Sequence, residues 1–129
     1  MRHPTWVSTT LGLYVICFGA GAFNHARDFL ARGSRPYAFL PLPLELFWSA
    51  LLPLDLAVII LLSCGCRRTG LTLAAAIMLV DVTANSHAVR SYGWDVGAAL
   101  QLQTLFLGFV LGSLPFLWPR GLGRPFRNA

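Results

Sequence analysis

Two aspartates lie within strongly apolar segments of the sequence. Asp81 is in the middle of LAAAIMLVDVTANSHAV, residues 73–89, and Asp55 is in LLPLDLAVIILL, residues 51–62. A charged carboxylate at the centre of a bilayer costs about 2.5–3.5 kcal/mol on insertion scales. We therefore expect each carboxyl to be neutral, or the two to share one proton. Either arrangement would make a proton-handling site.

The two aspartates are predicted to lie at the same depth. Each is roughly 12 or 13 residues from the Arg67–Arg68 turn, or about 20 Å along a helix. The short connection CGCRRTG makes the flanking segments antiparallel, so both carboxyls are expected near the midplane. Helix rotation, and hence whether they face one cavity, stays open. Pro53 has no backbone N–H, so the carbonyl of Ser49 lacks its usual hydrogen-bond donor. This predicts either a helix break that lines a site or a simple kink.

Other polar residues lie toward the outer side of the predicted bundle, above these aspartates. Asn85 is four residues after Asp81 and shares its helix face, whereas His87 points elsewhere. The remaining candidates for ligand or proton handling are Asn24, His25, Asp28 and Gln101, the last on one stripe with Thr104, Gly108 and Gly112. The candidates for a lid or rim are Arg27, Glu45, His87, Arg90 and Trp94. Together they predict an outward-opening polar cavity with the two aspartates at its floor.

Each of these groups also has a purely structural interpretation. The segment NHARD, residues 24–28, suits a helix end that meets water, and Asp81 with Asn85 suits a polar clamp between helices. His25 and His87 are a weaker candidate pair for haem or a metal, because the chain has no tight ligand motif such as H-x-x-x-H. We therefore predict no metal and no bound cofactor, with quinone and haem as the alternatives.

The elements that position these residues follow from composition. The chain has 129 residues, of which 56% are hydrophobic and 12% charged, with a mean hydropathy of +0.63. Apolar segments fall at about 6–23, 44–64, 71–88 and 97–118, each close to the ~20 residues that cross a bilayer as a helix. The first segment is interpreted as a retained span rather than a signal peptide. The prediction is an all-α integral membrane four-helix bundle, antiparallel, in a single transmembrane domain over residues 1–129.

Arginine placement predicts the orientation. All ten basic residues are arginines and flank the apolar segments, which disfavours nucleic-acid binding. Six are on one side of the predicted membrane: Arg2, Arg67, Arg68, Arg120, Arg124 and Arg127. Four are on the other: Arg27, Arg32, Arg35 and Arg90. The excess predicts cytoplasmic N- and C-termini in a bacterial inner (plasma) membrane.

Two stretches carry a resemblance to a known family. LGLYVICFGAGAFNHARD is a glycine-bearing first helix that ends in polar residues, and RRTGLTLAAAIM is an Arg-Arg-x-Gly turn into an alanine-rich helix. In these features and in its layout the chain resembles the small DoxX-like bacterial membrane proteins. The resemblance covers the first three helices loosely and the fourth hardly at all. It implies a link to membrane redox enzymes that use quinones, and it transfers no functional residue.

Two functions are compatible with these features. In the first, the cavity binds a small amphipathic, quinone-like or lipid-like molecule, and Asp55 and Asp81 hold or relay protons. In the second, the protein is a non-catalytic subunit or assembly partner of a larger, redox-type membrane complex, and the aspartates pair with polar groups of another membrane chain. A homo-oligomer is compatible with both. No nucleophile–base arrangement is apparent, so the assignment leans away from an enzyme.

Overall fold

Four long helices make up the structure, a computed structural model that describes residues 3–94 and 97–121. Within these two ranges there is no strand, and the helices are α1 (Thr5–Arg32), α2 (Leu42–Ser63), α3 (Arg67–Tyr92) and α4 (Gly97–Leu117). Each is long and apolar enough to cross a membrane. The chain is therefore a multi-pass membrane protein whose apolar helices contact lipid, and the predicted all-α four-helix bundle is confirmed.

The helices satisfy their own polar groups, as lipid requires. Five threonine hydroxyls donate to the carbonyl four residues earlier: Thr9, Thr10, Thr72, Thr83 and Thr104. Proline and glycine set the ends of two of these helices. α2 starts after Pro41 with Pro43 in its first turn, where the missing N–H costs nothing. α3 stops at Gly93, whose φ of 65° is left-handed and suits glycine.

α1 and α3 extend beyond the predicted spans. They have 28 and 26 residues, or about 42 and 39 Å at 1.5 Å per residue, which exceeds the ~30 Å hydrocarbon thickness. The predicted spans stopped where polar residues began, at 23 and 88. The helices continue to Arg32 and Tyr92 because no breaker comes before Gly33 and Gly93. The extra turns carry Asn24, His25 and Asp28 on α1.

Proline does not break α2. The helix is continuous through Pro53, which lies on an exposed face. Of the two alternatives predicted at this position, a break or a simple kink, the break is therefore wrong, and Asp55 lies on a continuous helix.

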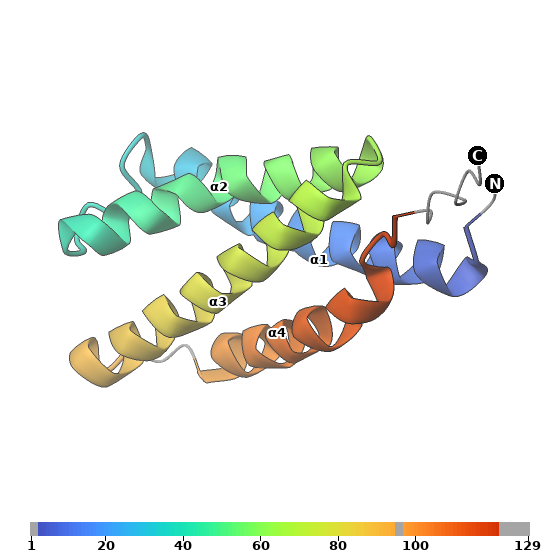
Figure 1. Ribbon diagram of the computed structural model, residues 1–129. Coiled ribbons are helices and arrows are strands. Elements are labelled where there is room, and N and C mark those ends of the chain that lie inside the picture. Colours follow the sequence, from blue (N-terminus) through green and yellow to red (C-terminus); the bar gives the residue numbers. More distant parts are fainter. Residues whose placement is uncertain (1–2, 95–96, 122–129) are drawn as a thin grey trace, which may run out of the picture.

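The bundle is narrow at the α2–α3 turn and widens toward its opposite end. α2 and α3 meet at their connecting turn and diverge toward the opposite end, and α4 ends beside that turn (Figure 1). Arg67 Nη2 donates to the Leu117 carbonyl at 2.5 Å and Arg68 Nη2 to the Pro119 carbonyl at 3.2 Å. These cations therefore hold the carbonyl end of α4. Three other arginines used to predict orientation lie outside the described residues: Arg2, Arg124 and Arg127.

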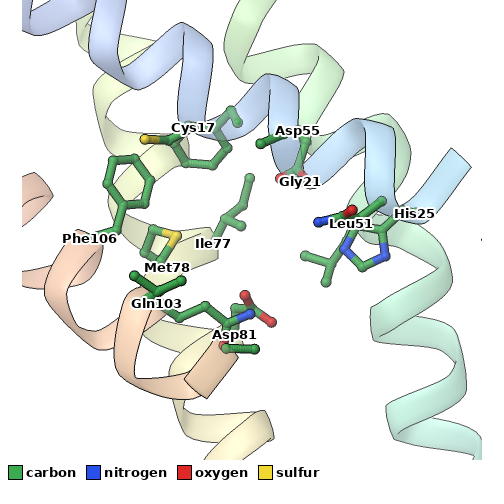
Figure 2. A pocket seen from close by; sticks show the side chains of 15 residues that line it. Cys17, Gly21, His25, Leu51, Asp55, Ile77, Met78, Asp81, Gln103 and Phe106 are labelled. Carbon is green, nitrogen blue, oxygen red and sulfur yellow. The ribbon is translucent and has the colours of Figure 1, made fainter. Parts of the chain in front are cut away.

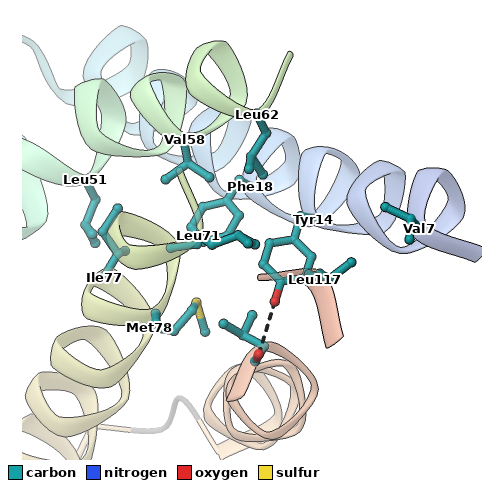
Figure 3. Close-up of a cluster of buried hydrophobic side chains, with 13 residues drawn as sticks. Val7, Tyr14, Phe18, Leu51, Val58, Leu62, Leu71, Ile77, Met78 and Leu117 are labelled. Atoms are coloured by element: carbon teal, nitrogen blue, oxygen red, sulfur yellow. Dashed lines mark hydrogen bonds between the residues drawn. The ribbon is translucent and has the colours of Figure 1, made fainter. Parts of the chain in front are cut away.

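The half of the bundle nearest that turn, here called the inner half, contains the tight core. Its fully buried side chains are Tyr14, Val58, Leu71, Val110 and Leu117. The Tyr14 hydroxyl lies 3.1 Å from the Val110 carbonyl oxygen (Figure 3). It also lies 2.8 Å from Ser113 Oγ. Because α1 and α4 make few other close approaches, this tyrosine is the main polar link that closes the bundle.

Replacing Tyr14 with Phe is expected to lower the free energy of unfolding by about 0.6–1.7 kcal/mol, the range of interhelical hydrogen bonds in membranes. The ring and its packing stay, while both polar contacts to α4 are lost. Thermal unfolding in lipid nanodiscs measures the change. Tyr92→Phe is the matched control, because Tyr92 is 45% exposed. An equal loss in both variants would contradict the assigned role.

Candidate functional site

The outer half of the bundle encloses a cavity of about 530 Å³ between all four helices (Figure 2). We call it the main cavity. Its polar lining consists of Asn24, His25, Asp55, Asp81 and Gln103. Its apolar lining includes Phe18, Leu51, Ile77, Met78 and Phe106. The structure therefore brings the two aspartates, which the sequence placed only at equal depth, to the walls of one space.

Asp55 has no hydrogen-bond partner among the described residues, although it is only 5% exposed. It fits because α1 has no side chain opposite it. A Cβ atom added at Gly21 would lie 2.6 Å from Asp55 Oδ2. The glycine lets the two helices approach at this point, and the carboxyl occupies the space.

Asp81 is held by one amide network. Asn85 Nδ2 donates to Asp81 Oδ1 at 3.0 Å and to Gln103 Oε1 at 2.7 Å. The predicted shared face of Asp81 and Asn85 is therefore confirmed, and the network fastens α3 to α4. Asp81 is 9% exposed and its second oxygen has no partner among the described residues. This clamp and the cavity coexist, so the structural and the functional interpretations of the pair are compatible.

A second polar chain lies toward the outer end. Tyr37 Oη donates to Asp28 Oδ2 at 2.7 Å and lies 2.8 Å from His25 Nδ1. Burial, and next the hydrogen bond to Asp28, raise the pKa of Tyr37 well above its ordinary value. The phenol therefore keeps its proton and donates it in a hydrogen bond to the Asp28 carboxyl. His25 must then donate through Nδ1, which leaves Nε2 of a neutral ring as an acceptor.

A smaller cavity of about 180 Å³ adjoins the main one at this end. Both cavities are lined by His25, Leu51, Asp81 and Gln103. Asp28, Tyr37 and Asn85 line only the outer one. A path of polar side chains therefore runs from the two aspartates to the outer end of the bundle.

Aromatic rings cover that end between α2 and α3. Trp48 lies 5.6 Å from Trp94 and 5.5 Å from Tyr37, measured between ring centroids, and Phe39 lies 5.5 Å from Trp94. The loop that carries Tyr37 and Phe39 forms turns. Glu45, predicted as a rim residue, is 6% exposed and accepts two hydrogen bonds from Arg35, at 2.7 and 2.8 Å. This pair fixes the loop to α2.

The main cavity opens between α1 and α4. Every lining residue from α2 and α3 is buried, whereas Cys17, Ala20 and Asn24 of α1 and Ala99 and Leu102 of α4 are exposed. Cys17 lies at this opening. The neighbouring surface is also apolar. In a membrane, such an opening leads sideways to the lipid.

Several predicted residues lie away from both cavities. Gln101 is exposed, together with Thr104, Gly108 and Gly112 of the same stripe. Gln103 takes the place that the sequence assigned to Gln101, because two residues rotate a helix position by about 200°. Arg27, His87 and Arg90 are also exposed and line neither cavity, and Trp94 belongs to the aromatic cover. Tyr37 was not selected as a site residue; its place between His25 and Asp28 depends on how the loop folds back.

The two histidines do not converge on one site. His25 lines both cavities, whereas His87 contacts Ser91 and Tyr92 on an exposed face. Over residues 3–94 and 97–121, no three His, Cys, Asp or Glu side chains group closely enough to hold a metal ion.

Comparison of the chain with protein-family models, with curated proteins and with solved structures found no match. The chemistry of the cavity is therefore the basis on which a function is inferred.

Gly21→Ala is expected to destabilise the protein, because the new methyl group overlaps the Asp55 carboxyl. Gly12→Ala on the same helix is the control, since its added Cβ would meet no atom within 4 Å beyond its chain neighbours and the backbone of its own helix. That variant should be neutral or gain stability from helix propensity, up to about 1 kcal/mol. Thermal unfolding followed by tryptophan fluorescence compares the two.

A double variant tests the cause. If the carboxyl is what the methyl group meets, adding Asp55→Ala should remove most of the penalty of Gly21→Ala, a positive coupling between neighbours. Additive losses would contradict the close approach of the two residues.

Proposed function

We propose that this protein binds a small amphipathic molecule in the main cavity, and that Asp55 and Asp81 recognise its polar group and exchange protons with it. The observation that carries this proposal is that two buried carboxyls, one without a partner among the described residues, line one cavity. We place the protein in a bacterial inner membrane with both termini cytoplasmic, so that the cavity lies in the outward half.

The size and lining of the cavity support a small ligand. Small-molecule sites typically have about 300–1,000 Å³ and combine an apolar wall with a few convergent polar groups. The main cavity has about 530 Å³. Phe18, Met78 and Phe106 supply apolar wall, and the polar groups are confined to the side of Asp55 and Asp81.

The opening supports an amphipathic ligand that arrives from the bilayer. Its edges on α1 and α4 are mostly apolar, and exposed apolar side chains such as Ile16 and Leu105 continue onto the lipid-facing surface. A molecule with an apolar tail can keep the tail in the opening while its polar head reaches the aspartates.

Proton handling follows from the cost of burying charge. A carboxylate at this depth costs about 2.5–3.5 kcal/mol on insertion scales, and the two acids face the same space. A polar ligand group that donates to or accepts from a carboxyl offsets part of that cost. Ligand binding and the protonation of the pair are therefore coupled.

The binding test uses the full-length protein in nanodiscs with three amphipathic probes: neutral decylubiquinone, anionic laurate and cationic tetraphenylphosphonium. At least one should raise the unfolding temperature of the wild type, by RT ln(1 + [L]/Kd) in free energy. The double variant Asp55→Asn/Asp81→Asn keeps the shapes of both side chains and should lose most of that gain.

Two results would decide against ligand binding. If no probe stabilises the wild type, or if each stabilises the double variant equally, the cavity is not a ligand site for this class. If the Asn substitutions instead release a second membrane chain that co-purifies with the wild type, the assembly-partner function replaces the proposal.

The rate at which Cys17 is alkylated tests the opening separately. In a Cys64→Ser/Cys66→Ser background, a bound probe should slow the alkylation of Cys17 by a membrane-permeant maleimide, because this thiol lines the cavity. The control is the converse protein, Cys17→Ser, in which Cys64 and Cys66 lie at the α2–α3 turn and should react at an unchanged rate. Equal protection at both ends would contradict a local site.

A further inference from the structure

The charges around the main cavity are unbalanced. Asp55 and Asp81 are its two carboxyls, and no arginine of the described chain lines either cavity. The other titratable side chains facing the aspartates are Cys17 and His25 of α1; α4 contributes only the neutral Gln103. A buried carboxylate normally needs a cation or several donors beside it, and the described residues supply neither to Asp55.

His25 does not fill this role, because its ring is neutral and its Nδ1–H already has a partner. Nδ1 donates to Tyr37 Oη, and Tyr37 donates to Asp28. A positive charge gained by the ring would be paired, through the phenol, with Asp28. The Arg35 guanidinium is in turn paired with Glu45. Among the described residues, the acids that have neither a cation nor a phenol donor beside them are therefore the two in the main cavity.

The rest of the lining suits a cation with an apolar body. Phe18 and Phe106 pack edge to face with their centroids 5.6 Å apart, and both line the cavity together with Met78. Aromatic faces attract cations, most strongly where water is excluded. The opening between α1 and α4 has mostly apolar edges, which suits the entry of a cation that carries its charge on a hydrophobic frame.

Building on the proposed function, we infer that the ligand is a lipophilic monocation, such as an amphipathic amine or a quaternary ammonium or phosphonium compound. It binds at Asp55 and Asp81 in exchange for a proton. The protonated pair gives one proton to water as the cation arrives, and the resulting carboxylate becomes the counter-ion. The total charge in the cavity therefore does not change, which is the arrangement that a low-dielectric site favours.

The exchange is tested with tetraphenylphosphonium, whose charge cannot titrate, so that any pH dependence of binding belongs to the protein. Binding to the protein in nanodiscs is measured by equilibrium dialysis against empty nanodiscs of the same lipid, between about pH 8 and pH 5. Affinity should fall on acidification, approaching about tenfold per pH unit if one proton is displaced. In weakly buffered solution, the wild type should release up to one proton per cation bound.

Matched variants locate the exchange. Asp55→Asn and Asp81→Asn should each weaken binding at least about tenfold and reduce its pH dependence. Glu45→Gln removes a carboxyl that lines neither cavity, and it should change the affinity less than about threefold. Proton release is read on the wild type alone, so the inference stays testable even if an Asn variant unfolds.

The outcomes separate this inference from the proposed function. Binding of decylubiquinone or laurate without tetraphenylphosphonium overturns the cation inference and leaves the ligand site standing. Cation binding that is independent of pH, or equal in the Asn variants, also overturns the exchange. If none of the three probes binds, both proposals fail.

Discussion

A carboxyl group held inside an apolar bundle is the constraint on which this structure depends. Asp55 approaches α1 where Gly21 leaves room for it, and no described residue offers it a hydrogen bond. Such a group is tolerated only if it is neutral or if something outside the protein satisfies it. The cavity beside it provides the space in which water, protons or a ligand can do so.

The inner half of the bundle holds the helices together, and the outer half contains the cavity. In the inner half, Tyr14 bonds to α4, Arg67 holds the end of α4, and side chains such as Leu71 and Leu117 are fully buried. This packing is the main closure between α1 and α4, which make few contacts elsewhere. Their outer halves line the cavity instead.

The outer half is organised in layers. Nearest the core are Asp55 and Asp81, then the amide network of Asn85 and Gln103, and then the chain from His25 through Tyr37 to Asp28. The aromatic cover closes the gap between α2 and α3, while the gap between α1 and α4 stays open. A ligand would therefore meet lipid on one side and polar groups on the other, which favours a molecule with two unlike ends.

The sequence alone determined the helices and the depth of the acids, because both depend on distance along the chain. Apolar runs of sufficient length must be helical in lipid. The spacing from the Arg67–Arg68 turn placed Asp55 and Asp81 at similar distances from that turn. The four-residue spacing of Asp81 and Asn85 likewise fixed a shared face. Only tertiary structure decided how each helix is rotated about its own axis, since this rotation depends on packing against neighbours rather than on local spacing. That rotation brought both acids to one cavity, chose Gln103 over Gln101, and added Tyr37 from a loop whose course no local pattern specifies.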